Sequence, residues 1–394
     1  MLHHSAVFLC AAKRTAIGSF QGALAEIPAP RLGSTVIEAV LSEARVPPES
    51  IDSVILGCVL TAGTGQAPAR QAAIFAGLST KVQALTVNKV CSSGLKAIML
   101  AANDIMLGHA KAVIAGGMEN MSNAPYTIPS MRKGARLGHA VAEDSVIHDS
   151  LWDVYNNCHM GNAAELCART YELSREAQDA FAIESYKRAN HAIEQGVFKE
   201  EIATVKVVSG KGESVFEIDE EPLKFRPEKI PGLKPVFDKS GTVTAANASS
   251  INDGAAAMLV CSEDFVRVHN LKPLARILAQ GWNAQAPEWF TTAPVGAIRQ
   301  ALSNAGLGIN DIDLFEINEA FSAVALACSK DLALDPKKMN INGGAVALGH
   351  PVGASGARIL TTLLYSLKRG KHSRGAVGIC NGGGEATSLV VERI

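Results

Sequence analysis

The sequence has no excess charge of either sign. Its 394 residues include 37 basic and 38 acidic side chains, and the formal net charge is −1. A balanced charge gives no general reason to bind nucleic acid or a membrane surface, so we expect neither as a partner. No apolar run approaches the ~20 residues that a membrane-spanning helix needs. Because the N-terminal segment also lacks the basic region of a secretory signal, we expect a cytoplasmic protein.

Common cofactor motifs are missing as well. None of the eight cysteines is spaced from another as Cys-x-x-Cys, which argues against a zinc ribbon and against a dithiol redox centre. A Walker-type phosphate loop is absent, and no G-x-G-x-x-G follows the first predicted strand. We therefore expect no metal and no nucleotide cofactor.

The composition that remains is that of a well-buried globular protein. Hydrophobic residues make up 47% of the chain and charged residues 19%. Short apolar runs predict strands at 6–12, 52–60 and 83–90, and amphipathic patterns predict helices at 32–45 and 92–107. This alternation is typical of a layered α/β fold of two or three domains.

An internal repeat suggests that the fold is duplicated. Residues 36–59 and 295–320 both read as a helix, a turn, an Ile-Asp pair and a strand, at an offset of 261 residues from Ile51 to Ile312. The next strand, helix and glycine cluster follow in the same order in both copies. Duplicated halves bring equivalent strand-to-helix loops to one crevice, where α/β folds bind ligands.

The repeat predicts three parts. The N-terminal half comprises 1–118 together with 250–271, and the C-terminal half comprises 272–394. Between them, 119–249 is an insertion that covers the crevice. Within the insertion, the stretch 224–239 carries five basic residues and two acidic ones, which is consistent with a solvated surface loop or with a phosphate-facing patch.

Three loops carry residues suited to chemistry. Cys91 lies between a predicted strand and a helix, where unpaired N–H groups would lower the pKa of a thiol, although a buried structural cysteine is as common. His350 lies in a glycine-rich turn stiffened by Pro351, as a precisely held imidazole or as a surface histidine. Cys380 ends an apolar strand and is followed by glycines whose N–H groups suit an oxyanion hole.

A fourth candidate is the Asn318-Glu319 pair, which interrupts an apolar run. A buried amide and carboxylate need partners, so the pair is either a water-holding or orienting pair or a helix N-cap. Two thiols, one imidazole and an amide-bearing turn together suggest acyl transfer through a thioester.

At this point the sequence resembles the thiolases over essentially its whole length. The segments that carry the resemblance are Asn88-Lys89-Val90-Cys91-Ser92-Ser93-Gly94, His159-Met160-Gly161, Asn247-Ala248-Ser249, Asn252-Asp253-Gly254, Asn318-Glu319-Ala320-Phe321, Gly349-His350-Pro351 and Cys380-Asn381-Gly382-Gly383-Gly384. The resemblance implies a duplicated α/β/α/β/α layered fold with an inserted loop domain.

The resemblance also implies roles for five residues. Cys91 would be the acylated nucleophile, His350 its activator, and Cys380 the acid/base that removes a proton from the acetyl-CoA methyl group. Asn318 would hold a water that shares one oxyanion hole with His350, and the N–H groups of Cys91 and Gly382 would form the other.

The implied reaction is a ping-pong condensation of two acetyl-CoA to acetoacetyl-CoA and CoA, with thiolysis as its reverse. A broader 3-ketoacyl-CoA thiolase of fatty-acid β-oxidation is the alternative, and an inactive scaffold relative is a third. The implied assembly is a homotetramer, a dimer of dimers, with contacts near 119–145. By position, the coenzyme A contacts would be Leu151, His159, Met160, Phe237, Ala248, Ser249, Phe290, Ala320 and Phe321.

Some of these positions have ordinary explanations, and some depart from the family. Leu151, Phe237 and Phe290 are equally typical of a hydrophobic core. Ala386 stands where the family usually has a further glycine, and the charged Glu385 precedes it, with a side chain that either points outward or alters Cys380. Pro222 follows an acidic pair where potassium-binding relatives have a tyrosine, so no metal is carried over.

Overall fold

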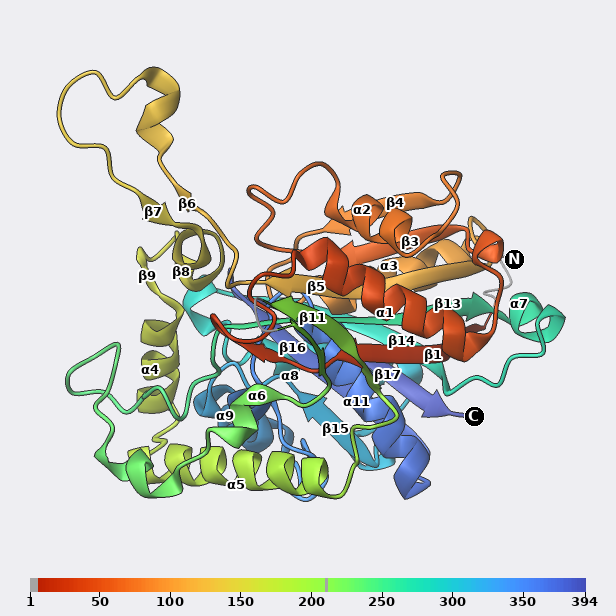
Figure 1. Ribbon diagram of the computed structural model, residues 1–394. Coiled ribbons are helices and arrows are strands. Elements are labelled where there is room, and N and C mark those ends of the chain that lie inside the picture. The colour runs from red at the N-terminus through yellow and green to blue at the C-terminus, as the bar shows by residue number, and fades with distance from the viewer. Residues whose placement is uncertain (1–5, 210–211) are drawn as a thin grey trace.

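The computed structural model describes residues 6–209 and 212–394 (Figure 1). One mixed sheet of 11 strands runs through this part of the chain. From edge to edge its main path is β15 (Leu314–Ile317), β16 (Arg374–Asn381), β17 (Glu385–Arg393), β14 (Ala275–Ala284), β1 (Val7–Thr15), β13 (Asn252–Ser262), β5 (Ala112–Asn120), β3 (Ser53–Gly57) and β4 (Gln83–Val87). Off this path, β2 (Gly18–Ser19) pairs with β13, and β10 (Ile202–Ala203) pairs with β1.

The strand order repeats outward from the β1–β14 junction. From β1 it runs through β13, β5, β3 and β4, and from β14 through β17, β16 and β15. In each half the first two pairings are antiparallel and the next is parallel. A parallel bridge from Phe315 to Met339 takes the place of the β3–β4 pairing. The predicted duplication is confirmed, and Ser53 and Leu314, which begin β3 and β15, differ by the predicted offset.

Helices divide the hydrophobic residues into layers. α3 (Ser93–Met106) and α11 (Ser355–Gly370) pack on each other and share one hydrophobic cluster with strands of both halves. α1 (Ala29–Ala44) and α2 (Pro68–Phe75) pack in a second cluster with the first half. α8 (Ala293–Ala305) and α9 (Ser322–Leu332) pack in a third with the second half. The result is the predicted α/β/α/β/α layering, and it sets the N-termini of α3 and α11 close together.

The chain between β5 and β13 forms the insertion. Its elements are β6 (Tyr126–Thr127), β7 (Glu143–Asp144), β8 (Trp152–Asp153), β9 (Cys158–His159), α4 (Met160–Thr170), α5 (Arg175–Glu194), β10, β11 (Val205–Ser209), β12 (Gly212–Phe216) and α6 (Glu220–Leu223). Figure 1 shows the segment between β6 and β7 projecting from the body. The short helices α7 (Glu263–Val268) and α10 (Ala345–Leu348) complete the fold.

The exact predicted boundaries remain a prediction. β5 continues to Asn120 and β13 begins at Asn252, and β10 of the insertion joins the main sheet. Residues 1–5 of the first predicted part and residues 210–211 of the predicted insertion lie outside the described residues. No described helix is long and apolar enough to cross a membrane.

Two predicted strands are too long. The strand predicted at 52–60 ends at Gly57, because the N–H groups of Val59 and Leu60 turn to the carboxylate of Glu119. The strand predicted at 83–90 ends at Val87, because the Asn88 side chain accepts the N–H of Val90 and begins a turn. Both corrections concern the loops that approach the predicted site.

The contact between the halves is tested at Gly117 on β5. A Cβ at Gly117 would overlap the carbonyl group of Gly353, which precedes α11 in the other half. We expect Gly117→Ala to destabilise the fold by about 1–3 kcal/mol through overpacking, seen as a lower melting temperature. Gly232→Ala, whose Cβ would meet no atom within 4 Å, is the matched control. Equal melting temperatures would contradict the tight approach.

Candidate active site

One cavity of about 400 Å³ gathers most of the predicted site residues. Both halves and the insertion contribute to its wall. Three predicted catalytic residues line it: Cys91, His350 and Gly382. All of the predicted coenzyme A contacts line it as well: Leu151, His159, Met160, Phe237, Ala248, Ser249, Phe290, Ala320 and Phe321.

The wall also contains residues that the sequence did not single out. They are Met121, Ser150, Val236, Thr244, Ala245, Ser250, Ile251 and Val352. Several of them directly adjoin predicted residues along the chain, and this adjacency is the one feature of the sequence from which they could have been found.

The aromatic rings in the wall pack on one another. His159 stacks on Phe237 with 4.7 Å between ring centroids, and Phe321 meets Phe237 edge-on.

Cys91 lies on a tight turn that leads from β4 into α3. Val90 has a left-handed φ of 47°, and its N–H is held by the Asn88 side chain at 3.0 Å. The Cys91 sulfur accepts the main-chain N–H of Gly382 and its own N–H, and both lower the pKa of the thiol. Burial acts more strongly and raises that pKa to about 12, with a further rise from the Glu119 carboxylate. The predicted low thiol pKa is therefore wrong for the unliganded protein.

His350 is buried at 5% exposure, which excludes the surface histidine. Its main-chain N–H donates to the side-chain oxygen of Asn252 at 2.9 Å. The ring nitrogen Nδ1 lies 2.6 Å from the Oγ of Ser355. The Ser355 hydroxyl also reaches the carbonyl oxygen of Pro351 at 2.9 Å, and when its proton lies there, Nδ1 carries the ring proton and donates to Ser355. The Nε2 atom is left with a free lone pair and has no partner among the described residues.

Burial also fixes the charge of His350. It lowers the pKa of the imidazole to about 3, and the Arg358 guanidinium lowers it further. The imidazole is therefore neutral near pH 7, as is the Cys91 thiol. Both groups line one cavity and both are neutral, so Nε2 can accept the thiol proton only as the sulfur attacks a substrate.

Cys380 lies near the end of β16 and is fully buried behind the cavity wall. Burial raises the pKa of its thiol well above the usual value, and the negative charge that Cys91 would carry raises it further. The Oγ of Ser92 donates to the carbonyl oxygen of Ile379 at 3.2 Å and ties the two cysteine loops together. A thiol with a raised pKa yields, once deprotonated, a strong base.

Asn318 and Glu319 have different environments. Both amide atoms of Asn318 are buried without a partner in the described part of the chain, which fits a residue that holds a water. The N-cap alternative is wrong, because α9 begins at Ser322. Glu319 accepts from Ser185 and Asn340 and from the N–H of Val346, so it anchors α10 instead of facing the cavity.

The basic stretch at 224–239 stays open between its two explanations. Its lysines and arginine (Lys224, Arg226, Lys229, Lys234, Lys239) are all exposed, as a solvated loop requires. Val236 and Phe237, in the same stretch, line the cavity. The phosphate-facing patch therefore remains a prediction. Among the described residues, no group of His, Cys, Asp and Glu could hold a metal ion.

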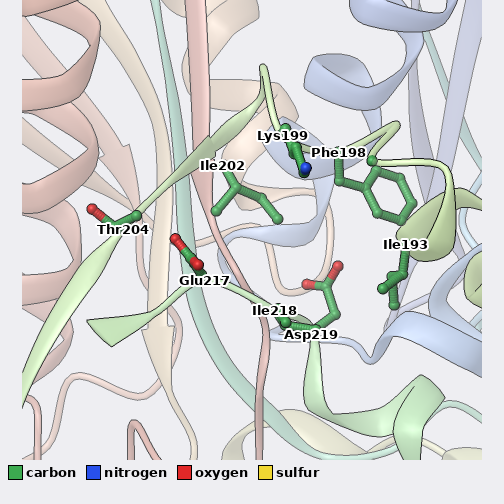
Figure 2. A pocket seen from close by; sticks show the side chains of 9 residues that line it. Ile193, Phe198, Lys199, Ile202, Thr204, Glu217, Ile218 and Asp219 are labelled. Atoms are coloured by element: carbon green, nitrogen blue, oxygen red, sulfur yellow. The ribbon is translucent and has the colours of Figure 1, made fainter. Parts of the chain in front are cut away.

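A second cavity of about 370 Å³ lies elsewhere, between the end of α5 and the chain before α6 (Figure 2). Asp219 lines it together with Lys199 and Glu217. The carboxylate of Asp219 is already engaged, because it accepts two hydrogen bonds from Arg14 and the N–H of Ile17. None of the predicted site residues lines this cavity.

Comparison with known proteins agrees with this geometry. The family described as "Thiolase, N-terminal domain" matches residues 7–264, and "Thiolase, C-terminal domain" matches residues 271–393. A protein named "Acetyl-CoA acetyltransferase" from Cupriavidus necator is 52% identical over 98% of this chain and 99% of its own length. "Acetyl-CoA acetyltransferase ERG10, cytosolic" from Gibberella zeae is 49% identical over 98% of each chain.

A solved structure also has the same fold. The crystal structure of the Bacillus anthracis acetyl-CoA acetyltransferase superposes with a TM-score of 0.98 and covers 100% of both chains at 39% sequence identity. The whole fold, including the insertion, is therefore shared.

The hydrogen bond from His350 to Ser355 gives a testable prediction. Ser355→Ala removes the partner that fixes the imidazole tautomer, a loss of about 1–1.5 kcal/mol, and we expect kcat to fall about tenfold with little change in KM. Ser366→Ala, which removes a buried serine farther along α11, is the control for stability. Equal kcat for both variants would contradict the role of Ser355.

Proposed function

The chain belongs to the thiolase family, and we propose that the Cys91 cavity carries out the reaction of an acetyl-CoA acetyltransferase. The enzyme is an acyltransferase that condenses two acetyl-CoA to acetoacetyl-CoA and CoA, and it runs the reverse thiolysis. The observation that carries this conclusion is the match to relatives of that name at about 50% identity over nearly the whole chain. The broader 3-ketoacyl-CoA thiolase is not favoured.

In the first half-reaction, the Cys91 sulfur attacks the thioester carbon of acetyl-CoA while Nε2 of His350 takes its proton. The carbonyl oxygen becomes negative and moves to the N–H groups of Cys91 and Gly382, which contact the sulfur in the resting state. The C–S bond to CoA breaks, and CoA leaves as a thiol with the proton of Cys380. Acetyl-Cys91, a Cys380 thiolate and a protonated His350 remain.

In the second half-reaction, the Cys380 thiolate removes a proton from the methyl group of the second acetyl-CoA. The raised pKa of this thiol suits a weak carbon acid, because it makes the thiolate a strong base. Protonated His350 and a water on Asn318 hold the enolate oxygen. The enolate carbon attacks acetyl-Cys91, acetoacetyl-CoA leaves, and the Cys91 sulfur recovers its proton from His350. Every proton is accounted for by the chain's own residues, so we propose that coenzyme A thioesters are substrates and that no cofactor is required.

The apolar wall supports a short acyl group. Met160 and Phe290 are both buried and enter the same hydrophobic cluster as Cys380, so little room is left beside the sulfurs. His159 and Phe237 form a stacked wall suited to a narrow pantetheine arm. We propose this wall as the coenzyme A site.

The projecting segment between β6 and β7 supports a homotetramer assembled as a dimer of dimers. It exposes large apolar side chains far from the body: Met131 at 57%, Leu137 at 100% and Val141 at 65%. Exposed apolar side chains gathered on one projection are typical of a protein interface. We also propose a cytoplasmic location, which the name of the cytosolic relative from Gibberella zeae supports. A role in lipid metabolism is proposed from the acetyl transfer itself.

Labelling separates the roles of the two thiols. We expect radiolabelled acetyl-CoA to acetylate Cys91 in the wild type and in Cys380→Ser, and to leave Cys91→Ala unlabelled. Cys380→Ser should lose condensation by a factor of about 10² or more, because serine is a poor general base here. Peptide mapping of the labelled protein is the measurement, with Cys158→Ser as control. Label on another cysteine, or normal condensation by Cys380→Ser, would reject these roles.

Chain length tests the substrate. We expect kcat/KM for thiolysis of acetoacetyl-CoA to exceed that for 3-ketooctanoyl-CoA by about tenfold or more, because each extra methylene must enter a filled wall. Steady-state thiolysis with both substrates at equal CoA is the measurement. Equal or better activity on the longer substrate would restore the β-oxidation alternative.

A further inference from the structure

We propose that the ion pair between Lys89 and Glu385 is a positioning pair, which holds the Gly382 turn against Cys91 and thereby sets the rate of acylation. The inference rests on the proposed roles of Cys91 and Gly382. It concerns two side chains that touch neither the substrate nor the reacting atoms. The Lys89 Nζ lies 2.5 Å from the Glu385 Oε2, and the pair joins the N-terminal half to the C-terminal half.

Lys89 is fixed to the nucleophile turn. It lies two residues before Cys91, and its N–H donates to the Oγ of Ser93 at 2.8 Å. The same Oγ donates to the carbonyl oxygen of Val90 at 2.6 Å. These two hydrogen bonds hold the main chain of Lys89 and Val90 to Ser93. The position of the Lys89 side chain is therefore coupled to the position of the Cys91 turn.

Glu385 is fixed to the other turn. It is the first residue of β17 and follows Gly383 and Gly384, whose φ angles of 89° and 81° lie in the left-handed region. Consecutive glycines make this turn the less rigid of the two. Asn381 bridges it, because its Nδ2 donates to the carbonyl oxygen of Gly382 at 2.8 Å and reaches Glu385 at 3.5 Å.

Two cross-half contacts therefore bracket the Cys91 sulfur. The inner one is the buried hydrogen bond from Ser92 to Ile379 at 3.2 Å, and the outer one is the ion pair. The inner contact lies three residues before Gly382, and the pairing of β16 with β17 ends at Asn381 and Glu385, so Gly382 itself lies at the tip of the hairpin, outside both. The ion pair adds a second point at the other end of this tip and limits the directions that the Gly382 N–H can take, and this N–H lowers the pKa of the Cys91 thiol.

The ion pair contributes little to overall stability. The side chains of Lys89 and Glu385 are 22% and 39% exposed, so solvent and salt screen their attraction. Its effect appears instead in the placement of one hydrogen-bond donor. For a pair of this exposure we expect acylation to slow by about two- to fivefold when the pair is broken.

Glu385→Gln separates positioning from a direct charge effect. Removing the Glu385 charge, with the Lys89 charge left in place, makes the surroundings of the sulfur more positive, which would stabilise a thiolate and speed its alkylation. Loss of positioning has the opposite sign, because the Gly382 N–H no longer holds the sulfur and the thiolate is destabilised. The direction of the change therefore decides between the two.

The experiment compares wild type, Glu385→Gln, Lys89→Met, the double variant and Lys368→Met. Lys368→Met breaks a half-exposed ion pair with Glu200 away from the site, and this variant is the matched control. Two rates are measured at one pH: iodoacetamide alkylation of Cys91 and single-turnover acetylation by saturating acetyl-CoA. We expect both rates to fall two- to fivefold in each single variant, the double variant to be no slower than either, and the control to be unchanged. KM should not move.

Salt gives a second readout on the same set of proteins. We expect 1 M salt to slow wild-type acetylation to the rate of the variants and to leave the variants unchanged. Faster or unchanged alkylation in Glu385→Gln, or additive losses in the double variant, would overturn the inference. If wild type itself is not acetylated at Cys91, the proposed function fails instead, so the two failures are distinguishable.

Discussion

The close backbone approach of the two halves at Gly353 is the constraint on which the site depends. A Cβ at Gly57, Gly94 or Gly117 would press on the Gly353 carbonyl group, so α11 can approach α3 only because these positions have no side chain. The N–H of Gly353 is in turn held by the carboxylate of Glu119, at the end of β5. This contact brings the His350 turn over the Cys91 turn.

The same close packing buries the reacting groups, and their desolvation determines the chemistry of the site. Desolvation keeps both thiols protonated and the imidazole neutral, because no charge is well solvated there. Proton transfer must then accompany each bond that forms or breaks. A strong thiolate base arises only after CoA has left, when an enolate has to be made. Before acetyl-CoA binds, both thiols are therefore protonated and react slowly with other electrophiles.

The repeat and the glycine clusters predicted the duplication and the three chemical loops, and the resemblance to the thiolases implied the residues that line the cavity. The predictions from sequence failed where the outcome depends on burial. Cys91 has the helix N-terminus that was expected, yet desolvation outweighs the local N–H groups. Ser355 and Glu119 were missed because a serine one turn past a histidine, or a glutamate ending a strand, carries no signal until the chain folds. The direction of Glu385 also depends on a partner 296 residues away.

The most direct test of the account is whether one short reagent can join the two sulfurs from opposite halves. Dibromoacetone alkylates a first thiol and then any second thiol within a few ångströms. The account predicts one intramolecular bridge between Cys91 and Cys380, located by peptide mapping, and its loss when acetyl-CoA first acetylates Cys91. A bridge from Cys91 to Cys58 or Cys158 instead, or alkylation of Cys91 without any bridge, would contradict a common site for the two thiols.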